Sequence, residues 1–187
     1  DIELLPKIEK DTIAAGTIFA DINELDAICH VVRAFADDSV YHVEGSVDPK
    51  RDIDMVNAEL ILYDLVFIEK RLERLELKIK QINDEPSRKE RDVLLRMKAH
   101  LDKTQPLRLL DLSPEEKKLI ASYPLVTRKE LMVALNVGEG SLKDHALLDE
   151  LRAAYAPIRM DLMQVSARVV GEIARLETEE DRRAFLA

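Results

Sequence analysis

The stretch that decides the fold begins with ELMVALNV at residues 130–137 and continues with ALLDELRAAYA at 146–156 and DLMQVSA at 161–167. The first and third segments are short apolar runs, which are typical of buried strands, and the second has the apolar spacing of a helix. A further helix is predicted from about Val169, so strands and helices alternate along this part of the chain. Such alternation predicts an α/β fold with a parallel sheet.

Upstream, DAICHVVRAF at residues 26–35 predicts another buried strand, because β-branched residues are enriched in it. A residue that precedes proline avoids the helical conformation, so a new element is expected at or just after Pro49. TIAAGTIF at 12–19 is ambiguous, since its alternation is poor. Residues 178–181 are suited to cap a last helix that reaches Ala187.

Between these segments lies a long helical pattern. Its apolar residues recur at alternating spacings of three and four, which is the heptad seam of a coiled coil: Ala58, Ile61, Leu65, Ile68, Leu72, Leu75, Ile79 and Ile82. NDEPS at 83–87 interrupts the pattern, and a second helix is predicted from about Arg88 to Asp102. An antiparallel helical hairpin is the natural interpretation, although two helices packed separately on a globular core would also fit.

The hairpin divides the chain into three expected segments. Residues 1–62 are the first part of an α/β domain, residues 63–122 a helical coiled-coil insertion, and residues 123–187 the second part of the domain. Inside the insertion, the sequence from Ser113 to Glu116 predicts a short helix that begins with a capping box.

Composition limits the classes of function. The chain has 187 residues and a formal net charge of -9, which opposes non-specific binding to DNA or to anionic membranes. No apolar run approaches the ~20 residues that span a bilayer. The single cysteine, Cys29, is expected to be a small buried hydrophobic residue, and its lack of a disulfide partner fits the cytoplasm. The four histidines lack metal-ligand spacing, so no metal site is expected.

Polar side chains follow two of the predicted strands. Ligands of open parallel sheets bind beyond the carboxyl ends of the strands, where this chain places Asn136-Val137-Gly138-Glu139 and Ser166-Ala167-Arg168. An asparagine can brace neighbouring loops or contact a purine edge, and a carboxylate three residues later accepts hydrogen bonds from N–H groups. The Asn-x-x-Glu pattern alone is weak, because an ordinary polar turn explains it equally well. A later strand that ends in Val-Ser-Ala makes it more specific.

Taken together, several stretches resemble the Obg-like ATPase family of the YchF type, a branch of the P-loop GTPases. They are DAICHVVRAF (26–35), HVEGSVDPKRDIDMVNAELILYDL (42–65), the hairpin, ALNVGEGSL (134–142) and VSARVVGEIARL (165–176). The resemblance implies a partial P-loop-NTPase-like parallel sheet interrupted by a coiled-coil hairpin. It also implies a nucleoside triphosphate hydrolase of the cytoplasm that is associated with ribosomes or translation.

The resemblance assigns roles to five residues. The family has Asn-x-x-Glu where ordinary GTPases have Asn-Lys-x-Asp, a change linked to accepting ATP. Asn136 and Glu139 would accordingly contact the base of ATP or GTP, with Val137 between them in the same site. Ser166 and Ala167 would form the supporting turn, and Mg²⁺ would be bound only in the intact protein. No residue is assigned a catalytic role.

The chain departs from the family at the phosphate-binding loop. A GxxxxGK[ST] loop needs two glycines five positions apart followed by Lys, and none of the five glycines forms such a pair: Gly16, Gly45, Gly138, Gly140 and Gly171. The switch segment that follows this loop in the family is missing as well. We therefore expect the chain to be incomplete with respect to the family and to lack hydrolytic activity by itself.

Basic residues on the hairpin leave a second function open. They are Lys70, Arg71, Arg74, Lys78 and Lys80 on the first helix and Arg88, Lys89, Arg91, Arg96 and Lys98 on the second. Interleaved glutamates favour a solvated coiled-coil surface, whereas the alternative is a surface that contacts RNA, the ribosome or a protein. The chain is thus interpreted as part of a nucleotide-dependent switch or, alternatively, as a non-enzymatic coiled-coil adaptor.

Overall fold

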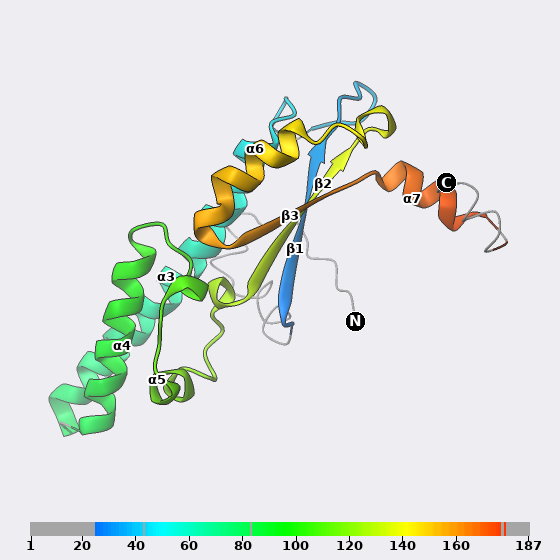
Figure 1. The fold of residues 1–187 in the computed structure, drawn as a ribbon. Coiled ribbons are helices and arrows are strands. Elements are labelled where there is room, and N and C mark those ends of the chain that lie inside the picture. Colours follow the sequence, from blue (N-terminus) through cyan, green and yellow to red (C-terminus); the bar gives the residue numbers. More distant parts are fainter. Residues whose placement is uncertain (1–24, 43, 83, 177, 179–187) are drawn as a thin grey trace. The chain divides into compact units, whose positions relative to one another are not determined.

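The structure is a computed structural model that describes residues 25–42, 44–82, 84–176 and 178 (Figure 1). The ambiguous segment at residues 12–19 lies outside the described residues, and so does nearly all of the helix expected to reach Ala187. The chain divides into two compact units. One contains residues 54–130 with the described residues up to Ile28 and is called the hairpin unit here; the other, the sheet unit, contains residues 29–53 and the described residues from 131 onward.

The sheet unit is built on three strands in the order β1-β2-β3. They are β1 (Ala27–Ala34), β2 (Glu130–Val137) and β3 (Met160–Val165). β2 and β3 pair in parallel, with Leu131 opposite Met160 and Asn136 opposite Val165. The arrowheads of β1 and β2 lie at the same end in Figure 1. The predicted α/β fold with a parallel sheet is confirmed.

The third strand ends earlier than predicted. β3 stops at Val165 instead of Ala167, because Ser166 is the N-cap of helix α7 (Ala167–Ala174), which was expected to begin near Val169. Ser166 and Ala167 therefore form the turn from strand to helix and are not part of strand β3.

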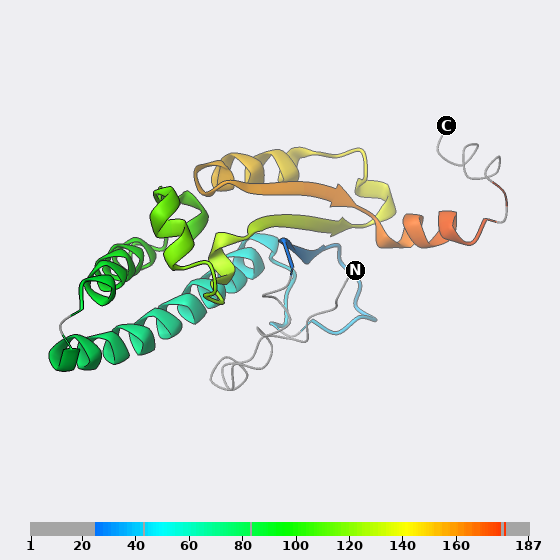
Figure 2. The same ribbon diagram turned by 90° about the horizontal axis from the view of Figure 1, so that it is seen from below.

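Helix α6 (Ala146–Tyr155) connects β2 to β3 and runs alongside β3 in Figure 2. Its buried face consists of Leu148, Leu151 and Tyr155. Leu131, Val133 and Leu135 of β2 are buried on alternate positions, as are Met160 and Leu162 of β3. Burial of these apolar side chains, at about 25 cal/mol per Å² of area removed from water, fixes the strand register that defines the carboxyl edge.

The hairpin consists of α3 (Pro49–Ile82) and α4 (Glu85–Leu101). α3 begins at Pro49 as predicted, and Asp48 Oδ1 accepts a hydrogen bond from Arg51 N at 3.0 Å. α4 begins three residues before the predicted Arg88, because Asp84 caps it by accepting a hydrogen bond from Ser87 N at 3.2 Å. The predicted seam is buried at its centre, where it shares one core with α4: Ile61, Ile68, Leu75, Leu94, Met97 and Leu101.

Shorter elements complete the two units. Helix α5 (Pro114–Leu119) has the predicted capping box, in which Ser113 and Glu116 bond each other's backbone N–H groups. The described residues also form the 3-10 helices η1 (Leu107–Leu109), η2 (Val126–Arg128), η3 (Glu139–Ser141) and η4 (Ala156–Ile158). The expected division at 62/63 and 122/123 stays a prediction; the chain passes from one compact unit to the other at 28/29, 53/54 and 130/131.

A buried carboxylate holds the hairpin unit together. Asp64 of α3 is fully buried, and its oxygens accept hydrogen bonds from Val126 N and Thr127 N, both at 2.9 Å, and from Thr127 Oγ1 at 2.5 Å. Thr127 Oγ1 in turn accepts a hydrogen bond from Leu107 N at 3.1 Å. Burial raises the pKa of Asp64 to about 6, although these hydrogen bonds act in the opposite direction. Asp64 thus fixes η1 and η2 against α3.

We predict that Asp64→Asn destabilises the chain even though it removes a buried charge. The asparagine amide has one acceptor oxygen, so at least one of the N–H groups of Val126 and Thr127 loses its partner, at a cost of about 1–3 kcal/mol. Urea unfolding followed by circular dichroism measures the change. The control is Asp92→Asn on the exposed face of α4, expected to change the free energy of unfolding by less than ~0.5 kcal/mol. Equal stability of Asp64→Asn and wild type would contradict this prediction.

Candidate functional site

The carboxyl ends of β2 and β3 are joined by a side chain. Asn136, the last residue but one of β2, is half-buried, and its Oδ1 accepts a hydrogen bond from Ala167 N at 2.9 Å. The register places Asn136 opposite Val165, two residues before Ala167. Strand pairing therefore brings together two residues that lie 31 positions apart in the sequence. Val137 follows as the last, buried residue of β2.

Ser166 has an unsatisfied hydroxyl at this edge. The residue is only 2% exposed, and its Oγ has no hydrogen-bond partner in the described part of the chain. It occupies the N-cap position of α7 without making a side-chain cap bond. Buried polar atoms are nearly always hydrogen-bonded, so this hydroxyl without a described partner is an exception at the carboxyl edge.

Glu139 lies on η3 directly after Gly138 and is exposed. Within the described ranges its carboxylate makes no hydrogen bond or ion pair, so its acceptor oxygens remain available. A methyl group built on Gly138 would lie 3.8 Å from Cβ of Phe35, the residue after β1. The ends of β1 and β2 therefore meet beside the loop that carries Glu139.

Gln164 of β3 also contributes to this region, and the sequence did not point to it. Its Nε2 donates to the carbonyl oxygens of Ser141, Leu142 and Asp144 at 2.9, 3.2 and 3.1 Å. The signal in the sequence was a glutamine between the apolar residues Met163 and Val165 of the strand. Its partners follow from the path of the loop after β2, which the sequence alone does not define.

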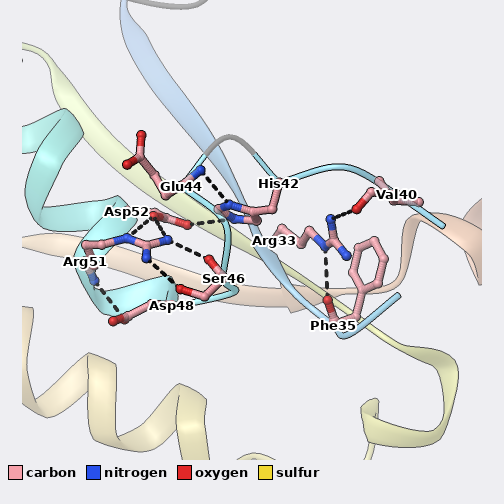
Figure 3. Close-up of polar contacts among 9 residues, drawn as sticks. All are labelled: Arg33, Phe35, Val40, His42, Glu44, Ser46, Asp48, Arg51 and Asp52. Atoms are coloured by element: carbon pink, nitrogen blue, oxygen red, sulfur yellow. Dashed lines mark hydrogen bonds and ion pairs between the residues drawn. The ribbon is translucent and has the colours of Figure 1, made fainter. Parts of the chain in front are cut away.

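A second polar network organises the loop between β1 and α3 (Figure 3). The Arg33 guanidinium donates to the carbonyl oxygens of Phe35, Asp37 and Val40 at 3.0, 2.9 and 2.9 Å. Two hydrogen bonds from Ser39 hold the pKa of the Asp37 carboxyl below its usual value. Because the guanidinium bonds to backbone carbonyls along this loop, Arg33 shapes the loop.

The other half of this network lies at the start of α3. Arg51 bonds Asp52 Oδ1 at 2.8 Å and Ser46 O at 2.7 Å, and His42 Nε2 lies 3.3 Å from Asp52 Oδ2. Figure 3 shows these side chains turned toward one another, with Arg51 beside Asp52. Both carboxylate oxygens of Asp52 have partners, so Asp52 supports the loop.

The expectation that Cys29 is buried is wrong. Cys29 is exposed, because β1 is an edge strand of the described sheet and its alternate residues, Cys29 and Val31, face away from the covered side. His30 points to the covered side, where burial lowers its pKa and the nearby Asp52 carboxylate opposes that shift.

Several basic side chains of the hairpin have acidic partners. Arg71 pairs with Glu90 at 2.6 Å, Lys98 with Glu69 at 3.1 Å, and Arg96 with Glu116. Glu90 also accepts a hydrogen bond from the Tyr123 hydroxyl, whose pKa is raised to about 12 by burial and by Glu90. On α3, three exposed cations have no ion pair with any residue that the structure describes: Lys70, Arg74 and Lys80.

The described residues contain neither a metal-binding cluster nor a membrane-spanning helix. Across the ranges that the structure covers, no cluster of three or more His, Cys, Asp or Glu side chains is arranged to hold a metal ion. None of the described helices combines the length and the hydropathy needed to cross a bilayer.

These features define a class of protein: an α/β nucleotide-domain-like sheet with a polar carboxyl edge and a helical hairpin inserted in the chain. No protein-family model matches the sequence. The chain is 37% identical over 168 residues to the ribosome-binding ATPase YchF of Bacillus subtilis, an alignment that covers 88% of this chain and 45% of that protein. It is 33% identical over 124 residues to Obg-like ATPase 1 of Oryza sativa subsp. indica, an alignment that covers 66% of this chain and 32% of that protein.

A solved structure of a YchF protein also matches the fold of this chain. The solved structure of the Schizosaccharomyces pombe YchF GTPase superposes with a TM-score of 0.78 at 27% identity, over 89% of this chain and 46% of that one. The chain is therefore homologous to the YchF-type Obg-like ATPases, and the resemblance seen in its sequence is confirmed. It spans less than half the length of these relatives.

We predict that Asn136→Ala uncouples the two strand ends. Ala167 N loses its acceptor, so its amide should exchange with solvent about ten-fold faster, and the sheet unit should lose about 1 kcal/mol of stability. Hydrogen exchange observed by NMR measures this effect. Asn136→Asp keeps an acceptor oxygen and should keep Ala167 protected. Slow exchange of Ala167 in the alanine variant would disprove the brace.

Proposed function

We propose that this chain supplies the base-recognition part of the nucleotide-binding domain of a ribosome-associated Obg-like ATPase. The observation that carries the proposal is the hydrogen bond from Ala167 N to Asn136 Oδ1 at 2.9 Å, at the carboxyl edge of a parallel sheet. Ligands of open α/β folds bind at that edge. The brace holds two loops in the positions from which both can contact one planar ligand.

The ligand that fits these groups is a purine nucleotide. The free carboxylate of Glu139 is suited to accept N–H groups of a purine ring or its exocyclic amine. The unsatisfied Ser166 hydroxyl can pair with a ring nitrogen or carbonyl, and Val137 supplies an apolar neighbour. Adenine and guanine both carry N–H donors, so ATP and GTP are both candidates.

Hydrolysis is assigned to a larger protein. Phosphoryl transfer depends on the loop, lysine and Mg²⁺ that surround the phosphates, and the 187 residues contain no GxxxxGK[ST] sequence. In this proposal Mg²⁺ and the phosphates are bound by the intact protein. The location that goes with ribosome association is the cytoplasm.

A second candidate function belongs to the hairpin. Lys70, Arg74 and Lys80 are exposed on α3 and have no ion pair with a described residue, unlike their neighbours Arg71 and Lys78. Exposed cations on one helix attract phosphate groups. The hairpin is therefore proposed to contact RNA of the ribosome. A coiled-coil adaptor without nucleotide binding remains the alternative for the chain alone.

We predict weak purine binding without turnover. Calorimetry with ATP and with GTP should give dissociation constants of about 10⁻⁴–10⁻³ M for the wild type, because a base contributes only part of nucleotide affinity. Asn136→Ala and Glu139→Gln should each weaken binding, whereas Glu150→Gln on the exposed face of α6 should not. Phosphate release should stay at background. Turnover that depends on Glu139 would refute the assignment, and so would equal binding by all variants.

We also predict a salt-dependent contact with RNA. Replacing Lys70, Arg74 and Lys80 together by alanine should weaken binding of the chain to ribosomes. It should also reduce the dependence of log K on log salt by roughly 0.7–0.9 for each phosphate that the variant no longer binds. The matched control removes three exposed lysines elsewhere in the hairpin unit, namely Lys103, Lys117 and Lys118. Co-sedimentation across a salt series measures both quantities. An equal effect of the two triple variants would argue against a specific surface.

A further inference from the structure

Gln164, which belongs to neither the Asn-x-x-Glu nor the Val-Ser-Ala motif, binds the backbone of the loop that follows Glu139. The Nε2 atom of Gln164 donates to three backbone carbonyl oxygens, those of Ser141, Leu142 and Asp144, at 2.9, 3.2 and 3.1 Å. A primary amide has only two N–H hydrogens, so the three carbonyls share them around one nitrogen. This convergence fixes the orientation of the amide, because its oxygen could not donate to any of them.

The position of Gln164 follows from the strand register. Gln164 lies opposite Leu135, and the next pair along is Val165 opposite Asn136. Side chains of successive residues point to opposite faces of a sheet. Gln164 therefore shares the face of the buried Leu135 and Leu162, whereas Asn136 is on the other face. The loop after β2 is thus tied to β3 from one face, and the turn after β3 is tied to β2 from the other.

The consequence concerns Glu139. Its carboxylate has no partner in the described ranges, so the backbone of η3 sets the point from which the Glu139 side chain can reach a ligand. Ser141, the last residue of η3, carries one of the three carbonyls that Gln164 holds. The amide of Gln164 is therefore a side-chain contact that connects the last residue of η3 to β3.

We propose that Gln164 is a positioning residue that sets the distance between Glu139 and a bound purine, and so determines how strongly the site distinguishes adenine from guanine. This inference rests on the proposed purine site. Glu139 accepts hydrogen bonds from N–H donors on the edge of the purine ring, and adenine and guanine place these donors differently. If the loop that carries Glu139 could move, its carboxylate could bond the donors of either base. A fixed loop favours one of them.

The main test replaces the donor without changing the size of the side chain. Gln164→Met removes both N–H groups and keeps the length of an unbranched side chain. The amides of residues 139–144 should exchange at least about ten-fold faster, since the loss of one or two hydrogen bonds has this size. The ratio of the ATP and GTP dissociation constants should move toward one. Gln81→Met, on the exposed surface of α3, is the matched control and should change neither quantity.

A second variant makes the tether depend on pH. Gln164→Glu places a carboxylate against three carbonyl oxygens, which repel it when it is ionised. A protonated carboxyl can donate again, so protection of residues 139–144 and the ATP-to-GTP ratio should recover as the pH falls toward about 5, near the upper end of the ordinary glutamate titration. A purely structural defect would show no such reversal. Wild type and Gln164→Met should show no change of this kind over the same range.

The outcomes separate the two claims. If the wild type distinguishes ATP from GTP and both Gln164 variants do so equally well at every pH, the positioning role of Gln164 is overturned while the purine site stands. If the wild type binds neither nucleotide, the proposed function is overturned and the selectivity role falls with it. Circular dichroism of each variant establishes that it is folded, and the recovery of Gln164→Glu at low pH supplies the test if the methionine variant is not.

Discussion

The hydrogen bond between Ala167 N and Asn136 Oδ1 is the contact on which the candidate site depends. A sheet fixes the spacing of its strands, but the loops beyond the strand ends are free unless a side chain crosses between them. The side-chain amide of Asn136 connects the two loops, and the same amide can also face a ligand. Glu139 is exposed, and Ser166 is buried without a described partner. Because Asn136 joins their two loops, both residues can belong to one site.

Three polar side chains, Asn136, Asp64 and Gln164, perform comparable tasks at different places. Asp64 accepts the N–H groups of η2 in the hairpin unit, and Gln164 donates to the carbonyls at and after the end of η3 in the sheet unit. Asp64 and Gln164 satisfy backbone groups of irregular segments, and Asn136 satisfies the N–H group of Ala167 at the start of helix α7. In each case a regular element, namely α3, β3 or β2, carries the polar side chain. Precise loops in this protein therefore depend on single polar residues placed on regular elements.

Much of the fold could be predicted from the sequence because the relevant signals are local. Strand β2 and the capping box of α5 follow from apolar spacing and from residues three positions apart. Cys29 was placed wrongly, because composition alone does not reveal that its strand lies at an edge of the described sheet. For the site, Asn136 and Ala167 were recognised as members of two motifs, and the family resemblance assigned both to the same base-binding site. Gln164 could not be predicted, since its role arises from the return of a loop over a strand and from the register of β2 with β3.

The most direct measurement is chemical-shift mapping of the ¹⁵N-labelled chain titrated with adenosine and guanosine, which probe the base without phosphates. The account predicts that the amides which shift with ligand concentration cluster at residues 136–144 and 166–168, from both strand ends at once. Shifts confined to one of these segments, or located in the helical hairpin, would contradict a purine site at the carboxyl edge of this sheet.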